Sequence, residues 1–305
     1  MTGRPINLAL AADERYVGHA AASIHSFLAH RGALELHVYF LHGEGFAPDL
    51  AHALTTMVTR EGGQITFLPV GRDRSDGLPA ASPFSIEMWF RIFLPELLSH
   101  DERVLYVDAD TIATDSIEPL WHTDLGDTYL AAVTNVFQHN HLHRPGELGL
   151  AGPEVYFNSG VLLLNLELMR RDGCTQAMHE LALERGAELE WPDQDVLNLV
   201  LGSRRLALHP RWNCMNGTLR FPTSVDVFGK QAVEEARRWP GIRHFEGPNA
   251  NKPWHRGCER DMHALYSRHR RATPWPDFEL EGTPSRLPMR RLTHAVGSRF
   301  NRRTR

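Results

Sequence analysis

The sequence contains few cysteines, and none of them forms a metal-binding pattern. The three cysteines, Cys174, Cys214 and Cys258, lie far apart, and no Cys-x-x-Cys pair occurs among the 305 residues. Structural zinc sites and disulfide scaffolds both depend on paired or closely spaced cysteines. Neither is predicted here, and reduced thiols in a cytoplasmic protein are the expected state.

Long apolar runs are also missing. A helix that crosses a bilayer needs about 20 apolar residues, and the sequence has no stretch approaching that length. The apolar segment 6–12 is followed at once by Asp13, Glu14 and Arg15, which is unlike the pattern of a secretory signal peptide. We therefore expect neither a membrane span nor a signal peptide in this sequence.

An excess of charge of one sign is absent as well. Lysine and arginine together number 33 and aspartate and glutamate 37, so the formal net charge is −4. That balance excludes a uniformly basic nucleic-acid-binding protein, and no nucleic-acid partner is expected. No glycine-rich phosphate loop follows the first apolar run, which excludes a dinucleotide fingerprint and a P-loop at that position.

Apolar runs and amphipathic segments alternate along the chain in a strand–helix rhythm. The pattern predicts strands at 6–11, 34–41, 64–70, 103–107, 129–134, 160–166 and 242–245, and helices at 17–30, 48–60, 85–98, 167–185, 195–201 and 229–238. The polar, histidine-rich segment 137–149 is expected to be a loop. A spacing of about 30 residues between the first strands predicts an α/β fold with a mostly parallel central sheet flanked by helices. Ligands of such sheets bind at the carboxyl ends of the strands.

Two carboxylates follow the predicted strand 103–107, in the motif Asp108-Ala109-Asp110. Carboxylate oxygens delivered to the edge of a sheet are suitable ligands for Mg²⁺ or Mn²⁺. A short motif of this kind also occurs by chance, and a second one stands at Asp193-Gln194-Asp195. A strand-end turn capped by an aspartate is the structural alternative.

Polar residues flank the next apolar run. Asn158 lies before the strand predicted at 160–166, and its amide offers a donor and an acceptor to a polyol. Asp193 and Gln194 lie before the helix predicted at 195–201. The structural alternative for the segment with Asn158 is a turn that enters a buried strand. For the segment with Asp193 and Gln194 it is a helix cap.

The segment 244–255 places His244 and Lys252 close together in sequence. An imidazole is a common metal ligand, and a lysine can bind phosphate as a point charge. Only two of the 33 basic residues are lysines, and one of them lies here. A surface loop anchored by Trp254 is the alternative. His141 and His143 are not predicted to bind metal, because no nearby carboxylate or cysteine completes a ligand set.

Taken together and in order, these motifs resemble one family. The sequence is similar to the retaining nucleotide-sugar glycosyltransferases of family 8, which have a GT-A fold, and in particular to the bacterial lipopolysaccharide α-galactosyltransferases, with the glycogenins as more distant relatives. The similarity spans about residues 6–260. It rests on six segments: 8–16 (LALAADERY), 104–110 (VLYVDAD), 116–126 (SIEPLWHTDLG), 157–166 (FNSGVLLLNL), 193–198 (DQDVLN) and 244–255 (HFEGPNANKPWH).

The resemblance implies a role for each matched position. Asp108, Asp110 and His244 match ligands of Mn²⁺ (or Mg²⁺). The positions that match contacts to the UDP-sugar donor are Ala11, Asp13 and Tyr16 for the uracil and ribose, Gly247 and Lys252 for the diphosphate, Arg91, Asn158, Asp193 and Gln194 for the sugar, and Ala109 between the two aspartates. Gln194 and Asp193 are the implied catalytic residues.

The family resemblance also sets expectations for function. It implies a UDP-hexose-dependent retaining hexosyltransferase that moves galactose or glucose to a hydroxyl of a glycan or glycolipid acceptor of the lipopolysaccharide type. Two alternatives stay open: a soluble transferase acting on a small glycoside or a protein, and a nucleotide-sugar-binding protein without turnover. The segments 80–83, 135–149 and 191–192 match the galactosyltransferases poorly, as does Glu246, so the acceptor is not expected to be shared with them.

The end of the sequence differs in composition from the rest. Residues 1–260 are predicted to form the catalytic domain and residues 261–305 a C-terminal extension. Residues 285–305 contain seven arginines and no acidic residue, so the preceding 284 residues hold 26 basic against 37 acidic side chains. Such a basic stretch favours peripheral contact with an anionic membrane at the inner face of the plasma membrane. A disordered basic tail is the alternative.

Overall fold

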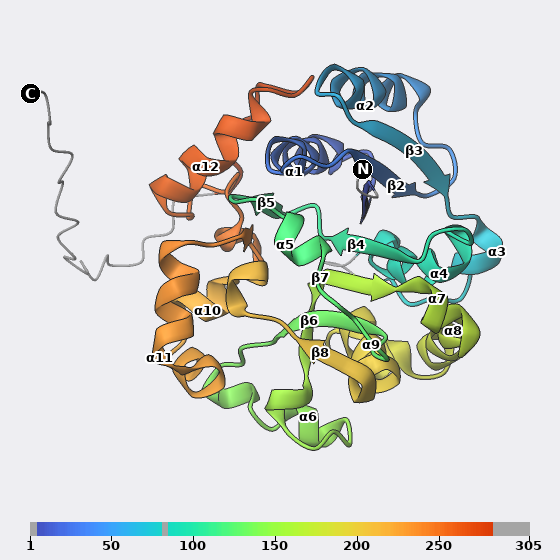
Figure 1. Cartoon of the computed structure of the whole chain (residues 1–305), viewed down its shortest axis with the longest axis vertical. Helices are drawn as coiled ribbons and strands as arrows, with labels where there is room; N and C mark the ends of the chain where they lie inside the picture. Colours follow the sequence, from blue (N-terminus) through green and yellow to red (C-terminus); the bar gives the residue numbers. More distant parts are fainter. Residues whose placement is uncertain (1–4, 81–84, 283–305) are drawn as a thin grey trace, which may run out of the picture.

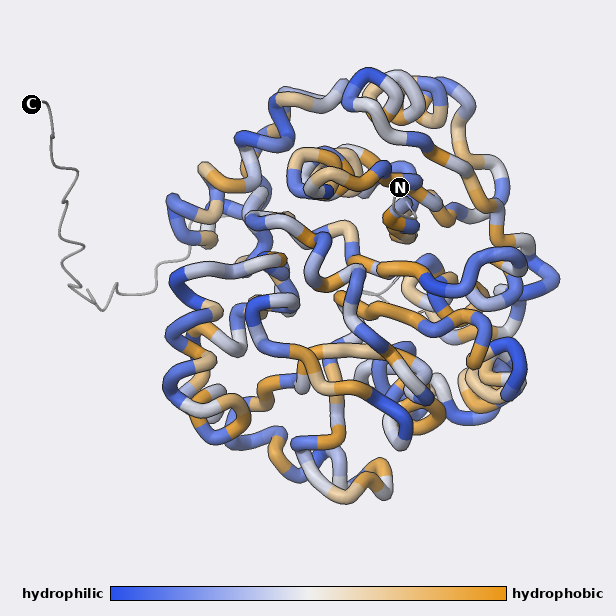
Figure 2. Tube along the Cα trace, viewed as in Figure 1, coloured by the Kyte–Doolittle hydropathy of each residue, from blue (hydrophilic) through white to orange (hydrophobic). Residues whose placement is uncertain are grey.

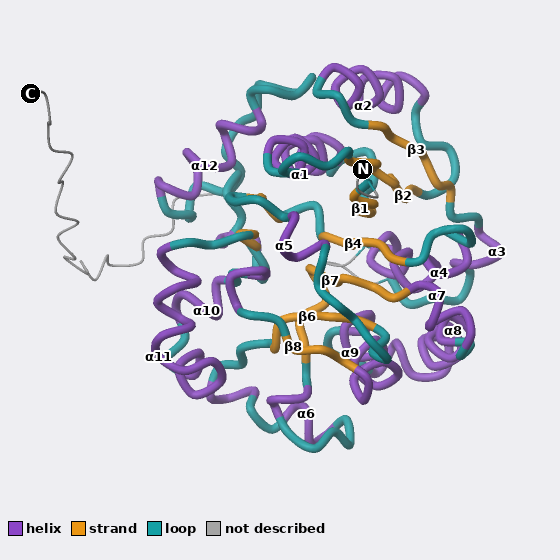
Figure 3. The backbone as a smooth tube through the Cα atoms, viewed as in Figure 1, coloured by secondary structure: helices purple, strands orange, loops and turns teal. Residues whose placement is uncertain are grey.

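The computed structural model describes residues 5–80 and 85–282. It contains a seven-stranded central sheet with the order β3-β2-β1-β4-β7-β6-β8 and a two-stranded sheet of β5 and β9. The strands are β1 (Ile6–Ala11), β2 (Leu36–His42), β3 (Gln64–Pro69), β4 (Arg103–Val107), β5 (Thr111–Ala113), β6 (Leu130–Thr134), β7 (Phe157–Asn165), β8 (Arg205–Ala207) and β9 (Ile242–His244). The sheet runs through the middle of the molecule with helices around it (Figures 1 and 3).

The longer helices are α1 (Val17–Ala29), α2 (Pro48–Arg60), α8 (Cys174–Arg185), α9 (Pro192–Leu201), α11 (Thr223–Arg238) and α12 (Arg260–Arg270). The shorter ones are α3 (Arg72–Ser75), α4 (Leu94–Leu97), α5 (Glu118–Trp121), α6 (Arg144–Glu147), α7 (Leu166–Arg171) and α10 (Asn216–Arg220). Among the described residues no helix is both long and apolar enough to cross a membrane.

The central sheet is mostly parallel, as predicted. β1 pairs in parallel with β2 and β4, β2 with β3, and β6 with β8, whereas β7 runs antiparallel to both of its neighbours. Side chains alternate across each strand, so β4 supplies Val104 and Tyr106 to one core and Leu105 and Val107 to the other. The apolar colour of the central strands β1, β4, β6 and β7 in Figure 2 reflects this burial on both faces, whereas the edge strands β3 and β8 are partly exposed.

Different helices cover the two faces. The core on one face is completed by apolar side chains of α1, α2 and α5, and the core on the other by those of α4, α7, α8, α9 and the 3-10 helix Ile86–Phe93. A third, smaller cluster of Ala22, Ile112, Phe245, Trp254 and Tyr266 joins α1 to α12. The helix α12 therefore packs against the domain on which the site is built.

The structure corrects several predicted elements. The segment predicted as one helix at 85–98 is the 3-10 helix Ile86–Phe93 followed by α4. The helix predicted at 167–185 is divided into α7 and α8 by Gly173, whose φ of 68° is left-handed. The loop predicted at 137–149 contains α6, and the helix predicted at 229–238 begins at Thr223 and is interrupted at Gly229.

Two further corrections bear on the site. The strand predicted to begin at residue 160 begins at Phe157, so Asn158 lies in β7 itself. The helix predicted to begin at residue 195 begins at Pro192, which places Asp193 and Gln194 in its first turn. Proline is favoured at the first helical position because its ring presets φ and its missing N–H has no partner there in any helix.

Candidate functional site

Three side chains that can bind a metal meet at the carboxyl end of β4. Asp108 and Asp110 follow that strand, and His244 is the last residue of β9. The strand β5 starts at Thr111, directly after Asp110, and Thr111 pairs with His244. This pairing carries the imidazole to the two carboxylates: His244 Nε2 lies 3.3 Å from Asp110 Oδ1 and 3.8 Å from Asp108 Oδ2. Among the described residues this is the only group of three or more histidine, cysteine or acidic side chains close enough together to hold an ion.

Gly160 in β7 leaves room for this cluster. Its carbonyl accepts a hydrogen bond from the backbone N–H of Asp108 at 2.9 Å. A Cβ at this position would overlap the ring of His244 and lie 2.8 Å from Asp108 Oδ2. Because Gly160 has no side chain, the space between the His244 ring and the Asp108 carboxylate stays open.

A buried amide sets the tautomer of His244. Asn213 Nδ2 donates to Asn158 Oδ1 at 2.8 Å, so the oxygen of Asn213 faces the imidazole. His244 Nδ1 then donates to Asn213 Oδ1 at 2.9 Å, so Nε2 faces the aspartates and can bind a metal ion once its proton has left. Metal-bound histidines usually have such a hydrogen-bond acceptor behind the ring. Two carboxylates and one neutral imidazole nitrogen fit Mn²⁺ or Mg²⁺.

The charges of the cluster depend on one another. Burial lowers the pKa of His244, but the Asp110 and Asp108 carboxylates outweigh it and hold that pKa above its usual value. Burial would raise the pKa of Asp110, but Lys252 and His244 together hold it well below its usual range. The Asp110 carboxylate is therefore anionic at neutral pH and attracts a cation.

Arg91 connects the metal-binding cluster to the first turn of α9. Its Nη2 lies 2.9 Å from Asp108 Oδ1 and 3.4 Å from Asp193 Oδ2. Its Nη1 donates to the carbonyl of Ser159 at 2.7 Å, and its guanidinium stacks over the Tyr106 ring at 4.4 Å. Burial raises the pKa of Asp193 to about 6, although Arg91 opposes that effect.

Gln194 is held by donors on β7. Its Oε1 accepts from Asn158 Nδ2 and from the backbone N–H of Ser159, both at 3.0 Å. Its Nε2 donates to the hydroxyl of Tyr156 at 3.1 Å. The side chain is buried, and every polar atom of the amide has a partner. Its orientation is consequently fixed before any ligand binds.

Lys252 lies on the other side of the metal-binding cluster. Its Nζ pairs with Asp110 Oδ2 and donates to the carbonyl of Phe245 at 3.0 Å. Gly247, in the same loop, has a φ of 89°, which residues other than glycine rarely adopt. The loop therefore turns at Gly247 and brings the ammonium group back to the carboxylates.

The residues predicted to bind the nucleotide lie beside this loop. β1 pairs with β4 through Ala9 and Tyr106 and ends at Ala11, and Ala109 lies two residues beyond the end of β4. Asp13 Oδ1 accepts from the backbone N–H of Tyr16 at 2.8 Å, which closes the turn between β1 and α1. The Tyr16 ring is 37% exposed and contacts Trp254 edge-to-face at 5.8 Å.

The structure thus places all of the predicted site residues at or beside the carboxyl edge of the sheet. Sequence reasoning missed Asn213, Tyr156, Ser159 and Arg144. Asn213 lies in an irregular segment without a motif, and the other three act through contacts between distant segments that no local pattern reveals. His141 and His143 do not join the metal-binding cluster; their nearest acidic partners are Glu190 at 3.8 Å and Glu147 at 3.5 Å, respectively.

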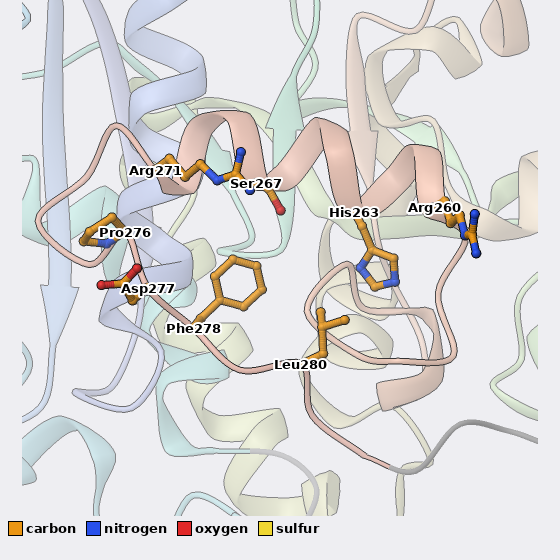
Figure 4. A pocket seen from close by; sticks show the side chains of 8 residues that line it. All are labelled: Arg260, His263, Ser267, Arg271, Pro276, Asp277, Phe278 and Leu280. Atoms are coloured by element: carbon orange, nitrogen blue, oxygen red, sulfur yellow. The ribbon is translucent and has the colours of Figure 1, made fainter.

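A separate pocket lies outside this site. It has a volume of about 350 Å³ and is bounded by α12 and the segment 276–280, as Figure 4 shows. None of its lining residues belongs to the set predicted from the sequence, and it contributes nothing to the cluster around Asp108.

Two curated bacterial proteins are similar to this chain over most of its length. The chain is 28% identical over 270 residues to general stress protein A of Bacillus subtilis, covering 87% of this chain and 92% of that protein. It is 27% identical over 285 residues to the lipopolysaccharide 1,2-glucosyltransferase of Escherichia coli, covering 90% and 80%, respectively.

A solved structure shares the fold. The galactosyltransferase LgtC, in complex with donor and acceptor sugar analogues, superposes with a TM-score of 0.77 at 26% identity, over 88% of this chain and 96% of that one. This confirms the predicted GT-A fold. The model of the family described as glycosyl transferase family 8 matches residues 7–258. The chain belongs to glycosyltransferase family 8.

Proposed function

We propose that this glycosyltransferase moves galactose or glucose from a UDP-sugar to a hydroxyl of a glycan or glycolipid acceptor, with retention of configuration and with Mn²⁺ or Mg²⁺. The observation that carries the proposal is the cluster of Asp108, Asp110 and His244, with the cations of Lys252 and Arg91 on either side. This arrangement suits a sugar joined to a diphosphate. The metal ion and a cationic side chain would stabilise the phosphate charges, and the polar groups would bind the sugar hydroxyls.

Asp108, Asp110 and His244 would hold the ion, which when bound supplies Lewis-acid stabilisation for the departing diphosphate. Lys252 adds a fixed positive charge on the same side. Its ammonium group pairs with Asp110 in the free protein, and it would move the short distance to a phosphate oxygen once that carboxylate binds the ion. Tyr16, Asp13, Ala11 and Gly247 would hold the remainder of the nucleotide.

The sugar would lie between the cluster and α9, in contact with Arg91, Asn158, Asp193 and Gln194. Retention by double displacement needs a nucleophilic carboxylate on the far face of the sugar. Gln194 is a poor nucleophile because it is an amide whose oxygen already accepts two hydrogen bonds. We therefore favour attack by the acceptor hydroxyl on the face that UDP leaves. The bond from the acceptor oxygen to the anomeric carbon forms as the bond to phosphate breaks, and the hydroxyl proton passes to a phosphate oxygen of UDP.

In this account Gln194 and Asp193 act on the sugar without forming a bond to it. The Gln194 dipole is preorganised, so it does not have to reorient when positive charge develops on the sugar ring. Asp193 orients the sugar hydroxyls and adds a negative charge.

The relatives support a lipopolysaccharide-type acceptor, since one is named as a lipopolysaccharide glucosyltransferase. The alternatives are a soluble transferase for a small glycoside or a protein, and a nucleotide-sugar-binding protein without turnover. The complete set of metal, phosphate and sugar contacts argues against loss of turnover.

Release of UDP tests the proposal. Purified protein is incubated with UDP-galactose or UDP-glucose, with Mn²⁺ or with EDTA, and free UDP is measured. We expect release of UDP that depends on the metal and that is lost in Asp110→Asn. Asp226→Asn makes the same substitution at an exposed aspartate of α11 and should release UDP as the wild type does. Binding of UDP-sugar without any turnover, even with a panel of glycan acceptors, would favour the binding protein instead.

The basic segment 285–305 lies outside the described residues. From its seven arginines we propose peripheral contact with the anionic inner face of the plasma membrane, where each arginine near the lipid surface contributes about 1 kcal/mol. Co-sedimentation with vesicles containing phosphatidylglycerol should fall when residues 285–305 are removed, and vesicles of phosphatidylcholine should bind neither form. Equal sedimentation of both forms would contradict this contact.

A further inference from the structure

Behind Gln194 lies a series of buried polar groups that the proposed chemistry does not use. Gln194 Nε2 donates to the Tyr156 hydroxyl at 3.1 Å, and that hydroxyl donates to Asp195 Oδ1 at 2.5 Å. Tyr156 and Asp195 are both fully buried. A buried carboxylate is costly unless it is paired and hydrogen-bonded, so a partner for its second oxygen is expected.

That partner comes from a distant loop. Asp195 Oδ2 accepts from Arg144 Nη2 at 2.6 Å and from the backbone N–H of Trp191 at 3.3 Å. Arg144 is the first residue of α6, within the segment 137–149. It lies within 135–149, one of the segments that match the galactosyltransferases poorly. The series therefore connects the first turn of α9 to the loop that differs from those relatives.

The chemistry of the phenol fixes the direction of each hydrogen bond. A tyrosine hydroxyl has one hydrogen to donate, and Asp195, as a carboxylate, can only accept it. The Tyr156 oxygen must then accept from Gln194, which turns the amide nitrogen to Tyr156 and the amide oxygen to Asn158 and Ser159. Burial raises the pKa of Tyr156 well above its usual value, and the charge of Asp195 adds to that effect. The phenol consequently stays a donor throughout the working pH range.

We propose that Arg144, Asp195 and Tyr156 are positioning residues that hold the Gln194 amide against the donor sugar and tie its orientation to the placement of the loop 137–149. This inference rests on the proposed function, because it assigns a task to the side chain that faces the sugar there. A purely structural role, with Asp195 capping α9, predicts a loss of stability and no change in the turnover of folded protein.

Tyr156→Phe tests the central hydrogen bonds by removing one oxygen atom. The ring that remains still packs against Phe137, 5.2 Å away between centroids. We expect kcat for metal-dependent UDP release to fall about 10- to 100-fold, as for a small misplacement of a reacting group. The KM for the donor should change by less than about threefold, because the metal and nucleotide contacts are intact.

The chain offers a matched control. Tyr129 donates to Asp172 Oδ2 at 3.0 Å, and Arg204 pairs with the same oxygen at 3.0 Å. This is the same combination of residue types away from the cluster around Asp108, so Tyr129→Phe should keep the wild-type kcat. Thermal unfolding curves of all variants report the fraction of folded protein at the assay temperature.

Arg144 tests the loop end of the series. Arg144→Met should lower kcat in the same way as Tyr156→Phe, and Arg144→Lys, which keeps the charge, should recover part of it. Wild-type kcat in Tyr156→Phe or in Arg144→Met would overturn the inference and leave the proposed function standing. If the wild-type protein itself releases no UDP from either donor, the proposed function fails, and the positioning role fails with it.

Discussion

Gly160 brings the backbone of β7 directly against the cluster of Asp108, Asp110 and His244. The space that its missing Cβ leaves is bounded by the ring of His244 and by Asp108 Oδ2. Its own φ is not in the left-handed region, so an alanine can adopt the backbone conformation. The consequence of a substitution is therefore steric and confined to the cluster.

This geometry predicts the effect of Gly160→Ala. The added methyl group should displace His244 or Asp108 and weaken Mn²⁺ binding at least about tenfold, the usual scale for disturbing the support of a metal ligand. Isothermal titration calorimetry with Mn²⁺ and UDP measures it, with circular dichroism to confirm folding. Gly146→Ala, which has open space around its Cβ position, should bind as the wild type does; equal affinity in both variants would contradict the assignment.

Asp193 allows a second prediction at this scale, without metal or donor. Its pKa is about 6 in the folded protein, raised by burial from 3.8. The folded state therefore binds more protons than the unfolded state between these values, and stability falls as the pH rises from about 4 to 6. Asp193→Asn removes that cost.

We expect Asp193→Asn to be more stable than the wild type by about 1–3 kcal/mol at pH 8, with the difference vanishing near pH 4. Urea unfolding at both pH values measures this, and Asp226→Asn serves as the exposed control. A variant that is less stable than the wild type at pH 8 would show that the pairing of Asp193 with Arg91 outweighs the burial of its charge.

Between α1 and α12, buried histidines respond to pH in the opposite direction. His19 stacks on Trp254 at 3.7 Å, and its Nδ1 lies 2.6 Å from the Tyr266 hydroxyl. Burial lowers its pKa to about 3, with the charge of Arg270 adding to the effect. The unfolded chain takes up this proton near pH 6.5, so stability is complete above that pH and declines as the pH falls toward 3.

By pH 4 the protonation of His19 in the unfolded chain should lower the free energy of unfolding by about 3 kcal/mol. His19→Gln should therefore lose less stability between pH 7 and pH 4 than the wild type does, whereas His52→Gln on the exposed face of α2 should follow the wild type. Parallel thermal unfolding at the two pH values compares them. Identical slopes for His19→Gln and the wild type would rule out His19 as the source.

The bounds of a helix or strand could be predicted where the local sequence alone determines them. β1, α1 and α2 were predicted within a residue of their observed bounds, because the apolar run of β1, the alanine-rich sequence of α1 and the proline at the start of α2 are local signals. β7 was predicted to start three residues late, because Asn158 is polar and its burial is compensated by Asn213 and Gln194, which are distant in sequence.

At the scale of the whole molecule, the site combines residues from Ala11 to Lys252. The motifs around Asp108 and His244 could be found in the sequence, but β5 and its pairing with β9, which join them, could not, because a three-residue strand has no periodicity to detect. Asn213 was missed for a similar reason, since only the folded chain brings it behind the imidazole. The order of the motifs in the sequence indicated which residues form the candidate site. How these residues contact one another depends on the pairing of strands, which the sequence does not show.

One measurement tests the central claim directly. Proton NMR of the protein with Mg²⁺, the diamagnetic one of the two proposed ions, and a UDP-α-hexose, observed from the first turnovers, reports donor use, metal dependence and stereochemistry together. The account predicts that the first sugar product carries the α configuration and that EDTA or Asp110→Asn stops its formation. A β-configured first product, or turnover that persists in EDTA, would contradict it.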